Sequence, residues 1–160
     1  MEEIRLMPAL PEDADLFYSL MCEAFLPLYL RYQDHETSPA NEPLEKTVRR
    51  LSAPDSHCFF ISADGQIVGG IRIVDGNDGE RRISPLFVAP RFQNRGIAGR
   101  VLAMCFEKFS DTVLWRLTTI KQEPGNCWLY RKMGFRQTPG ETVINDKMTL
   151  INFERRREEV

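Results

Sequence analysis

The chain has 160 residues, of which 42% are hydrophobic and 10% aromatic, enough for the core of one domain and short for two. Its net charge is −2 and its pI is about 5.8, which argues against a nucleic-acid-binding protein, because such proteins usually carry a strong basic excess. The most apolar stretch, Leu20 to Leu30, contains Glu23 and Pro27 and is too short to span a bilayer. We therefore expect a single domain over residues 1–160, with no membrane segment.

Cysteine and histidine usage gives little support to a metal site. No CxxC pair occurs, and the chain has only two histidines, His35 and His57. Scattered single cysteines are typical of reduced core residues in a cytoplasmic protein. The four are Cys22, Cys58, Cys105 and Cys127. The acidic start of the chain also differs from the basic, apolar start of a signal peptide. The sequence thus predicts a cytoplasmic protein without bound metal.

The first third of the chain predicts one strand and two helices. Residues 2–7 alternate loosely as in a short strand, and a helix is expected over 11–26, with Pro11 in its first turn and acidic residues near its positive end. Apolar residues then recur at helical spacing. The polar, proline-punctuated segment 31–43 is typical of a loop, and a second helix is expected over 43–52.

The middle of the chain predicts three consecutive strands. They cover residues 57–63, 66–74 and 80–88, and glycine-containing turns separate them. Pro85 interrupts the third strand and removes a ladder donor, so pairing must loosen there or the residue must sit at a bulge.

The last third alternates helices and strands. An amphipathic helix is expected over 96–109, a strand over 113–118, a short helix over 124–133 and a final strand or hairpin arm over 142–153. The order predicts an α/β (α+β) domain with a mixed, mostly antiparallel sheet. An antiparallel edge near the C-terminus could pair in a homodimer.

The segment LFVAPRFQNRGIAGRVL, residues 86–102, has the features of a phosphate-binding turn. An apolar strand leads into a loop with Gly96 and Gly99, and an amphipathic helix follows. Loop N–H groups and a helix N-terminus both attract anions, and three arginines add positive charge. They are Arg91, Arg95 and Arg100. The alternative is a loop that only turns the chain, with arginines on a solvated face. The pattern is neither GxGxxG nor GxxxxGK[ST], so it supports neither a Rossmann site nor a P-loop.

At this point the sequence resembles the GNAT superfamily of acetyltransferases. Residues 93–98, QNRGIA, match the family signature Q/R-x-x-G-x-G/A, and residues 126–135, NCWLYRKMGF, are similar to a second family segment. The stretches 29–40 and 118–123 resemble a bacterial subgroup of unassigned substrate. The resemblance implies a six- to seven-stranded sheet flanked by about four helices, and acetyl-coenzyme A as the acetyl donor.

The resemblance also implies a cofactor site. The backbone of Phe87 and Val88 would hold the pantetheine arm like an added strand, and the segment from Gln93 to Arg100 would hold the diphosphate. The implied cofactor-binding residues are Phe87, Val88, Gln93, Asn94, Arg95, Gly96, Ile97, Ala98, Gly99, Arg100 and Asn126. The Val88 N–H is the implied donor to the oxyanion.

Tyr130 is the candidate general acid. It lies four residues after Asn126, so the two share a face of the expected helix. A phenol with an ordinary pKa of about 10 is protonated at neutral pH and can donate to a departing thiolate. The alternative is a core tyrosine with its hydroxyl at the edge. Asn126 could bind the cofactor or cap its helix.

Three residues are candidates for the general base. Glu80 opens the strand over 80–88, where some relatives carry a carboxylate, although a solvent-facing turn residue is an equal interpretation. His57 opens another strand, and His35 lies in the loop near the expected acceptor groove. The sequence does not choose among them.

The sequence predicts an amine acceptor, a small molecule or a peptide, without identifying it. Four acidic residues could attract a cationic acceptor or could form an ordinary charged surface. They are Asp34, Glu36, Glu42 and Glu45. Two other functions stay open, a non-catalytic acyl-coenzyme A-binding regulatory module on the same fold and a nucleotide-binding domain.

Overall fold

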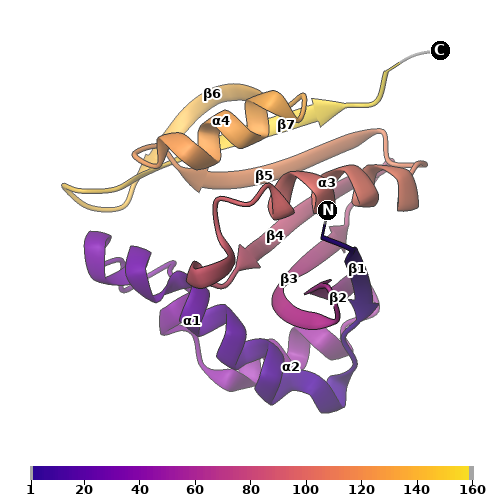
Figure 1. Ribbon diagram of the computed structural model, residues 1–160. Helices are drawn as coiled ribbons and strands as arrows, with labels where there is room; N and C mark the ends of the chain where they lie inside the picture. Colours follow the sequence, from indigo (N-terminus) through magenta and orange to yellow (C-terminus); the bar gives the residue numbers. More distant parts are fainter. Residues whose placement is uncertain (1, 159–160) are drawn as a thin grey trace.

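The computed structural model describes residues 2–158 and shows one seven-stranded mixed sheet in the order β1-β2-β3-β4-β5-β7-β6 (Figure 1). The predicted domain, residues 1–160, includes Met1, Glu159 and Val160, which lie outside the described residues. The strands are β1 (Ile4–Pro8), β2 (Ser56–Ala63), β3 (Gln66–Asp75), β4 (Glu80–Val88), β5 (Leu114–Ile120), β6 (Arg136–Val143) and β7 (Thr149–Arg156). Neighbouring strands are antiparallel except for the parallel pair β4 and β5. The predicted fold class is confirmed.

Helices cover both faces of this sheet. The long α-helices are α1 (Ala14–Tyr32), α2 (Leu44–Ser52), α3 (Ile97–Lys108) and α4 (Pro124–Lys132). Figure 1 shows α1 and α2 on one face and α3 and α4 on the other. Two buried clusters follow from this layering. One joins α1 to Phe60 and Phe87, and the larger one joins α3 to the opposite face of the strands. Within residues 2–158, no helix combines the length and apolarity that a membrane crossing needs.

Helix α1 runs six residues beyond its predicted end. The expected helix ended at residue 26, whereas α1 continues through Pro27 to Tyr32 and stops at Gln33, which adopts a left-handed φ of 52°. An internal proline costs a helix about 3 kcal/mol. Burial of Tyr32 and its contact with α4 favour the longer helix, because the Tyr32 hydroxyl donates to Glu123 Oε2 at 2.8 Å. Tertiary contacts therefore override the local breaker.

The C-terminal strand prediction was incomplete. The expected single arm over 142–153 is a hairpin of β6 and β7, and β6 begins at Arg136. Strand β6 lies at the sheet edge and is almost entirely exposed, so it carries no alternating apolar pattern. Pro139 and Gly140 lie within it, at a shift in register between Gln137 and Glu141.

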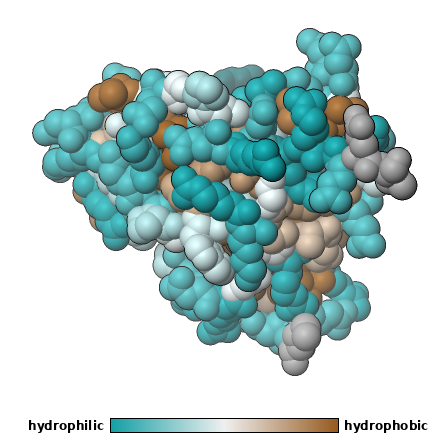
Figure 2. All heavy atoms as spheres, turned by 90° about the horizontal axis from the view of Figure 1, so that it is seen from above, coloured by the Kyte–Doolittle hydropathy of each residue, from teal (hydrophilic) through white to brown (hydrophobic). Residues whose placement is uncertain are grey.

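The face of the molecule at the top of Figure 1 is mostly hydrophilic, as Figure 2 shows.

Strand β4 changes its pairing halfway along. Its partner residues in β3 are Ile71 opposite Leu86 and Ile73 opposite Ile83, so Ser84 and Pro85 form a bulge, as Pro85 predicted. The Arg72 Nε donates to the Ser84 carbonyl at 2.6 Å across this bulge. On the other side, β4 pairs with β5 only over Glu80 to Arg82. The two strands separate beyond Arg82, and this separation positions the site.

Candidate active site

The open edge of β4 presents main-chain groups toward the gap between β4 and β5. The Ala89 N–H donates to the Val68 carbonyl of β3 at 2.7 Å. Because backbone groups alternate along a strand, Phe87 also points its N–H and carbonyl at β3, whereas Leu86 and Val88 point theirs into the gap. The Gln93 Nε2 donates to the Val88 carbonyl at 2.9 Å, which agrees with this alternation. The Val88 N–H is thus free to meet a ligand.

The loop after β4 carries a run of unpaired N–H groups. Among residues 2–158, the six N–H groups from Asn94 to Gly99 have no hydrogen-bond partner. Asn94 and Gly96 have positive φ angles of 63° and 76°, and α3 begins at Ile97 without a side-chain cap. Successive N–H groups at a helix N-terminus form a concave site for an anion. We call these six N–H groups the cradle.

The residues predicted to surround the diphosphate differ in their partners. Arg91 is engaged by Glu23, with 2.7 Å between Nη1 and Oε1, and Arg95 approaches Glu2 at 3.7 Å. Arg100 forms no ion pair within residues 2–158. A Cβ atom at Gly96 would meet open space, whereas one at Gly99 would lie 3.4 Å from Leu129 Cδ1. A side chain would thus have space at both positions, and it is the positive φ of Gly96 that favours glycine in the cradle.

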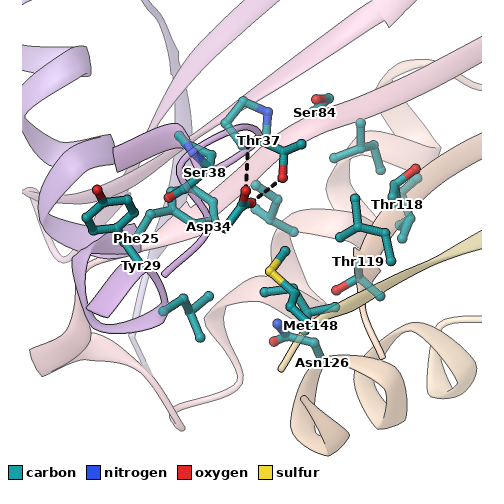
Figure 3. A pocket seen from close by; sticks show the side chains of 18 of the residues that line it. Phe25, Tyr29, Asp34, Thr37, Ser38, Ser84, Thr118, Thr119, Asn126 and Met148 are labelled. Carbon is teal, nitrogen blue, oxygen red and sulfur yellow. Dashed lines mark hydrogen bonds between the residues drawn. The ribbon is translucent and has the colours of Figure 1, made fainter. Parts of the chain in front are cut away.

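A cavity of about 270 Å³ lies between the separated strands and continues under the end of α1. Its wall comes from α1 and the following loop, from β4 and β5, and from α4 and the strand hairpin behind it. Figure 3 shows Tyr29, Asp34 and Ser38 on one side, Thr118 and Thr119 on the other, and Asn126 nearby. The apolar part of the lining is Phe25, Leu28, Ile83, Pro85, Leu86, Leu117, Ile120, Met148 and Leu150.

Tyr130 and Asn126 both line this cavity, as their spacing on α4 predicted. Burial raises the pKa of the Tyr130 phenol to about 12, so the hydroxyl keeps its proton at neutral pH. That hydroxyl has no hydrogen-bond partner among residues 2–158 and is available to a ligand. Asn126 does not cap α4, because the N-cap position belongs to Glu123.

The three candidate bases lie outside the cavity wall. Glu80 pairs with Arg116 at 3.0 Å, and this hydrogen bond lowers the pKa of the carboxyl. His57, at the start of β2, pairs with Asp75, with 2.9 Å between Nε2 and Oδ2. His35 is exposed, but its Nδ1 lies 2.8 Å from the hydroxyl of Tyr29, which does line the cavity. Only the His35 side chain is thus in contact with a cavity residue.

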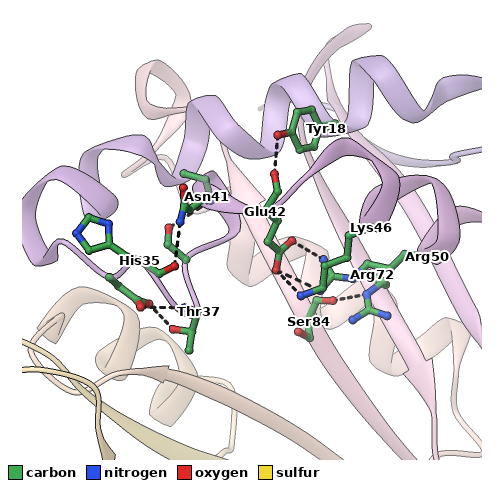
Figure 4. Close-up of polar contacts among 12 residues, drawn as sticks. Tyr18, His35, Thr37, Asn41, Glu42, Lys46, Arg50, Arg72 and Ser84 are labelled. Atoms are coloured by element: carbon green, nitrogen blue, oxygen red, sulfur yellow. Dashed lines mark hydrogen bonds and ion pairs between the residues drawn. The ribbon is translucent and has the colours of Figure 1, made fainter.

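Two of the four predicted acidic residues, Asp34 and Glu42, are engaged in internal contacts, whereas Glu36 and Glu45 are exposed. Asp34 is 2% exposed and accepts hydrogen bonds from the N–H groups of Glu36 and Thr37 and from the Thr37 hydroxyl. Glu42 binds Lys46 and Arg50 at 3.1 and 2.9 Å (Figure 4). These two carboxylates hold the loop together, which leaves less charge to attract a cationic acceptor.

The cysteines have the environment of packing residues. Burial raises the pKa of Cys58 to about 11 and that of Cys105 to about 12, so both stay thiols. Cys127 is buried beside Tyr130, and its Sγ lies 3.8 Å from the Ile120 carbonyl. All four cysteines are free.

Sequence reasoning left much of the cavity wall without a role. Leu86 and Thr118 fall in the stretches 86–102 and 118–123, but nothing marked either as a cavity residue, and Arg82 stands in no motif. Strand alternation could have placed Leu86 and Val88 on one edge of β4, because residues two apart share a side. No local pattern identifies Thr118 or Arg82, since they meet only where β5 leaves β4.

Comparison with known proteins places this geometry in a family. The acetyltransferase (GNAT) domain family matches residues 31–157, so the chain belongs to the GNAT acetyltransferases. It is an acetyltransferase, of the class that takes its acetyl group from acetyl-coenzyme A. The resemblance at residues 93–98 is thereby confirmed. A comparison with curated protein sequences gives no match.

Solved structures share the fold at low sequence identity. An acetyltransferase from Thermus thermophilus is 20% identical, with a TM-score of 0.74 over 98% of this chain and 99% of that one. An N-acetyltransferase from Thermoplasma acidophilum in complex with coenzyme A is 16% identical, with a TM-score of 0.70 over 96% and 99%. An acetyltransferase of the GNAT family from Streptococcus pneumoniae is 16% identical, with a TM-score of 0.72 over 98% and 100%.

Proposed function

We propose that this protein transfers an acetyl group from acetyl-coenzyme A to the primary amine of a small molecule or peptide, by direct attack. The observation that carries the proposal is that an anion-binding cradle and an unpaired phenol flank one opened strand edge. The related protein from Thermoplasma acidophilum was solved with coenzyme A, which supports the choice of donor.

The chain offers a matching group for each part of the donor. The cradle N–H groups and Arg100 suit the diphosphate, and Leu86 and Val88 suit the amides of the pantetheine arm. Phe87 contributes its ring to the core beneath α1 rather than its main chain to the gap. Gln93 fixes the loop by its bond to Val88, and Asn126 lies in the cavity wall next to the proposed thioester position.

The chemistry needs a neutral amine, a donor to the thioester oxygen and an acid for the departing sulfur. Acetyl-coenzyme A supplies the activated acetyl group when bound. The Val88 N–H donates a hydrogen bond where negative charge develops on the carbonyl oxygen. The new N–C bond would form and the C–S bond break, the amine would release one proton to solvent water, and Tyr130 would give its proton to the sulfur and regain one from solvent. Glu80 takes no part, because Arg116 holds it outside the cavity.

The test is release of free thiol when the protein is mixed with acetyl-coenzyme A and a panel of primary amines and peptides. We expect thiol release that depends on the amine, together with a mass increase of one acetyl group on the acceptor. Tight coenzyme A binding without acetylation of any panel member would favour the regulatory module. Stabilisation by ATP or NAD but not by coenzyme A would favour the nucleotide-binding domain instead.

We propose a cytoplasmic protein that acts as one catalytic domain over residues 1–160. The edge strand β6 is the surface on which a homodimer could form, because its outer backbone groups have no neighbouring strand within the described sheet. Size-exclusion chromatography with light scattering measures this directly.

A further inference from the structure

We propose that the acceptor carries a carboxylate as well as its amine, and that Arg82 recognises this carboxylate. The inference rests on the proposed function and narrows the acceptor to amino acids and similarly charged small molecules. It starts from the charged groups in the cavity wall. The twenty residues of that wall include one carboxylate, Asp34, and one cation, Arg82.

The two charges differ in how they are already satisfied. Asp34 is buried, and its oxygens accept three hydrogen bonds from its own loop. Arg82 has no carboxylate within 4 Å among residues 2–158, and its guanidinium forms one hydrogen bond, from Nη1 to the Thr118 hydroxyl at 3.2 Å. A guanidinium has five N–H donors, so most of the donors of Arg82 are available to a ligand. The guanidinium of Arg82 is therefore the charged group of the cavity wall that keeps most of its donors open, whereas the oxygens of Asp34 are satisfied by neutral donors of its own loop.

Two neighbouring arginines on β4 and β5 are, in contrast to Arg82, paired with carboxylates. Arg81 binds Asp75 and Asp111 at 2.9 and 2.7 Å, and Arg116 binds Glu80 at 3.0 Å. Arg116 is the partner of Arg82 in the β4–β5 register, yet it does not line the cavity. Arg82 is the last residue of β4 that pairs with β5, so it stands where the cavity opens.

Two polar side chains orient Arg82. The Thr118 hydroxyl accepts from Arg82 and donates to the Asn152 Oδ1 at 2.7 Å, which joins β4, β5 and β7 in one chain of hydrogen bonds. Figure 3 shows Thr118 on the cavity side opposite Tyr29 and Asp34. An arginine held in this way can form a bidentate pair with a carboxylate. Thr118 is a positioning residue in this arrangement.

The rest of the wall fits a small aliphatic group attached to the carboxylate and the amine. Leu28, Leu86, Leu117 and Leu150 line the cavity, whose volume of about 270 Å³ is smaller than a typical drug-sized pocket. Arg82 lies at the mouth of the cavity and Tyr130 at its α4 side. The acceptor would bind Arg82 through its carboxylate and direct its amine toward Tyr130.

The test uses matched amines with and without the carboxylate. Leucine is compared with leucinamide and 3-methylbutylamine, and 5-aminopentanoate with pentylamine, by thiol release at fixed acetyl-coenzyme A. We expect at least one carboxylate acceptor to exceed its neutral partners in kcat/KM, and Arg82→Gln to reduce that preference about 10- to 100-fold, because hydrogen bonds to charged groups are strong. Thr118→Val should reduce it by a smaller factor.

Arg136→Gln is the matched control. It removes one exposed positive charge from β6, outside the cavity wall, and Arg136 forms no ion pair within residues 2–158, so the preference should persist. Wild-type protein that favours the neutral amines, or an Arg82→Gln variant that keeps the carboxylate preference, would overturn the inference while leaving the proposed function in place.

A binding measurement separates this inference from the proposed function. If coenzyme A binds but no acceptor turns over, calorimetry of the same pairs on the coenzyme A complex decides: tighter binding of the carboxylates supports the inference and equal binding overturns it. If coenzyme A itself does not bind, the proposed function fails, and the same calorimetry on the free protein decides the carboxylate preference.

Discussion

The cradle and the cavity adjoin the same opened strand, but they are built in different ways. The cradle comes from six consecutive residues, Asn94 to Gly99, whose N–H groups converge because a loop runs into a helix. The cavity draws on α1, β4, β5, α4 and β7, which are distant in sequence. The cradle uses backbone groups, held by the positive φ angles of Asn94 and Gly96, and the cavity uses side chains. We therefore expect the cradle to decide which cofactor binds, and the cavity to decide which acceptor reacts.

The largest expected effect is a loss of turnover when Tyr130, in the cavity wall, is changed. Tyr130→Phe removes the proposed acid and should lower kcat about 10²- to 10⁴-fold, the range typical of general acid catalysis. The affinity for coenzyme A should change little, because the ring remains. Thiol-release kinetics and calorimetry measure the two quantities. Tyr18→Phe is the control, since the Tyr18 hydroxyl donates to the Glu42 carbonyl at 2.6 Å away from the cavity wall. Equal rates in both variants would remove Tyr130 from the mechanism.

The second prediction isolates the cradle by changing the ligand. Pantetheine keeps the thiol and both amides of coenzyme A but lacks the diphosphate and nucleotide. We expect pantetheine to bind at least about 100-fold more weakly than coenzyme A, because it leaves the six N–H groups of the cradle without an anion. Competition calorimetry measures the difference. Similar affinities for the two ligands would mean that the cradle does not contact the diphosphate.

A smaller effect distinguishes the arginines beside the cradle. Arg100→Gln should weaken coenzyme A binding about tenfold, and this loss of affinity should grow as the salt concentration falls, because salt screens the charge of a half-buried arginine less at low ionic strength. Arg91→Gln is the matched control, since Glu23 already engages Arg91 at 2.7 Å. The preference for carboxylate acceptors should be the same in both variants. Equal losses of affinity would show that only the summed positive charge matters.

The smallest effect is on stability at alkaline pH. Burial raises the folded-state pKa of Tyr130 to about 12, whereas the unfolded phenol ionises near the ordinary tyrosine pKa of 10.0. The unfolded chain therefore loses this proton first, so its contribution to stability is intact below pH 10 and is lost as the pH rises toward 12. At pH 11 the loss is about 1 kcal/mol. Urea unfolding at pH 8 and 11 should show this extra loss in the wild type and not in Tyr130→Phe.

Sequence reasoning placed most elements but erred where long-range contacts decide. The strands over 57–63, 66–74 and 80–88 match β2, β3 and β4 within a residue, because each has apolar residues bounded by turn signals. The end of α1 was set too early, because Pro27 is a local stop signal and Tyr32 is held by Glu123 from α4. Strand β6 was missed, because its exposed edge carries no apolar pattern.

The same division holds within the candidate site. Residues 93–98 and the Asn126–Tyr130 spacing carry their information in consecutive residues or in a single helical turn, so the sequence alone indicated the family, which the family match confirms, and predicted the cradle and the phenol. The charge balance of the cavity depends on which acids find partners. Asp34 is bound by its own loop, Glu80 is held by Arg116, and Arg82 is left without a carboxylate among the described residues. Only the tertiary structure decides such pairings, because an ion pair forms between residues that folding brings together from different strands and loops.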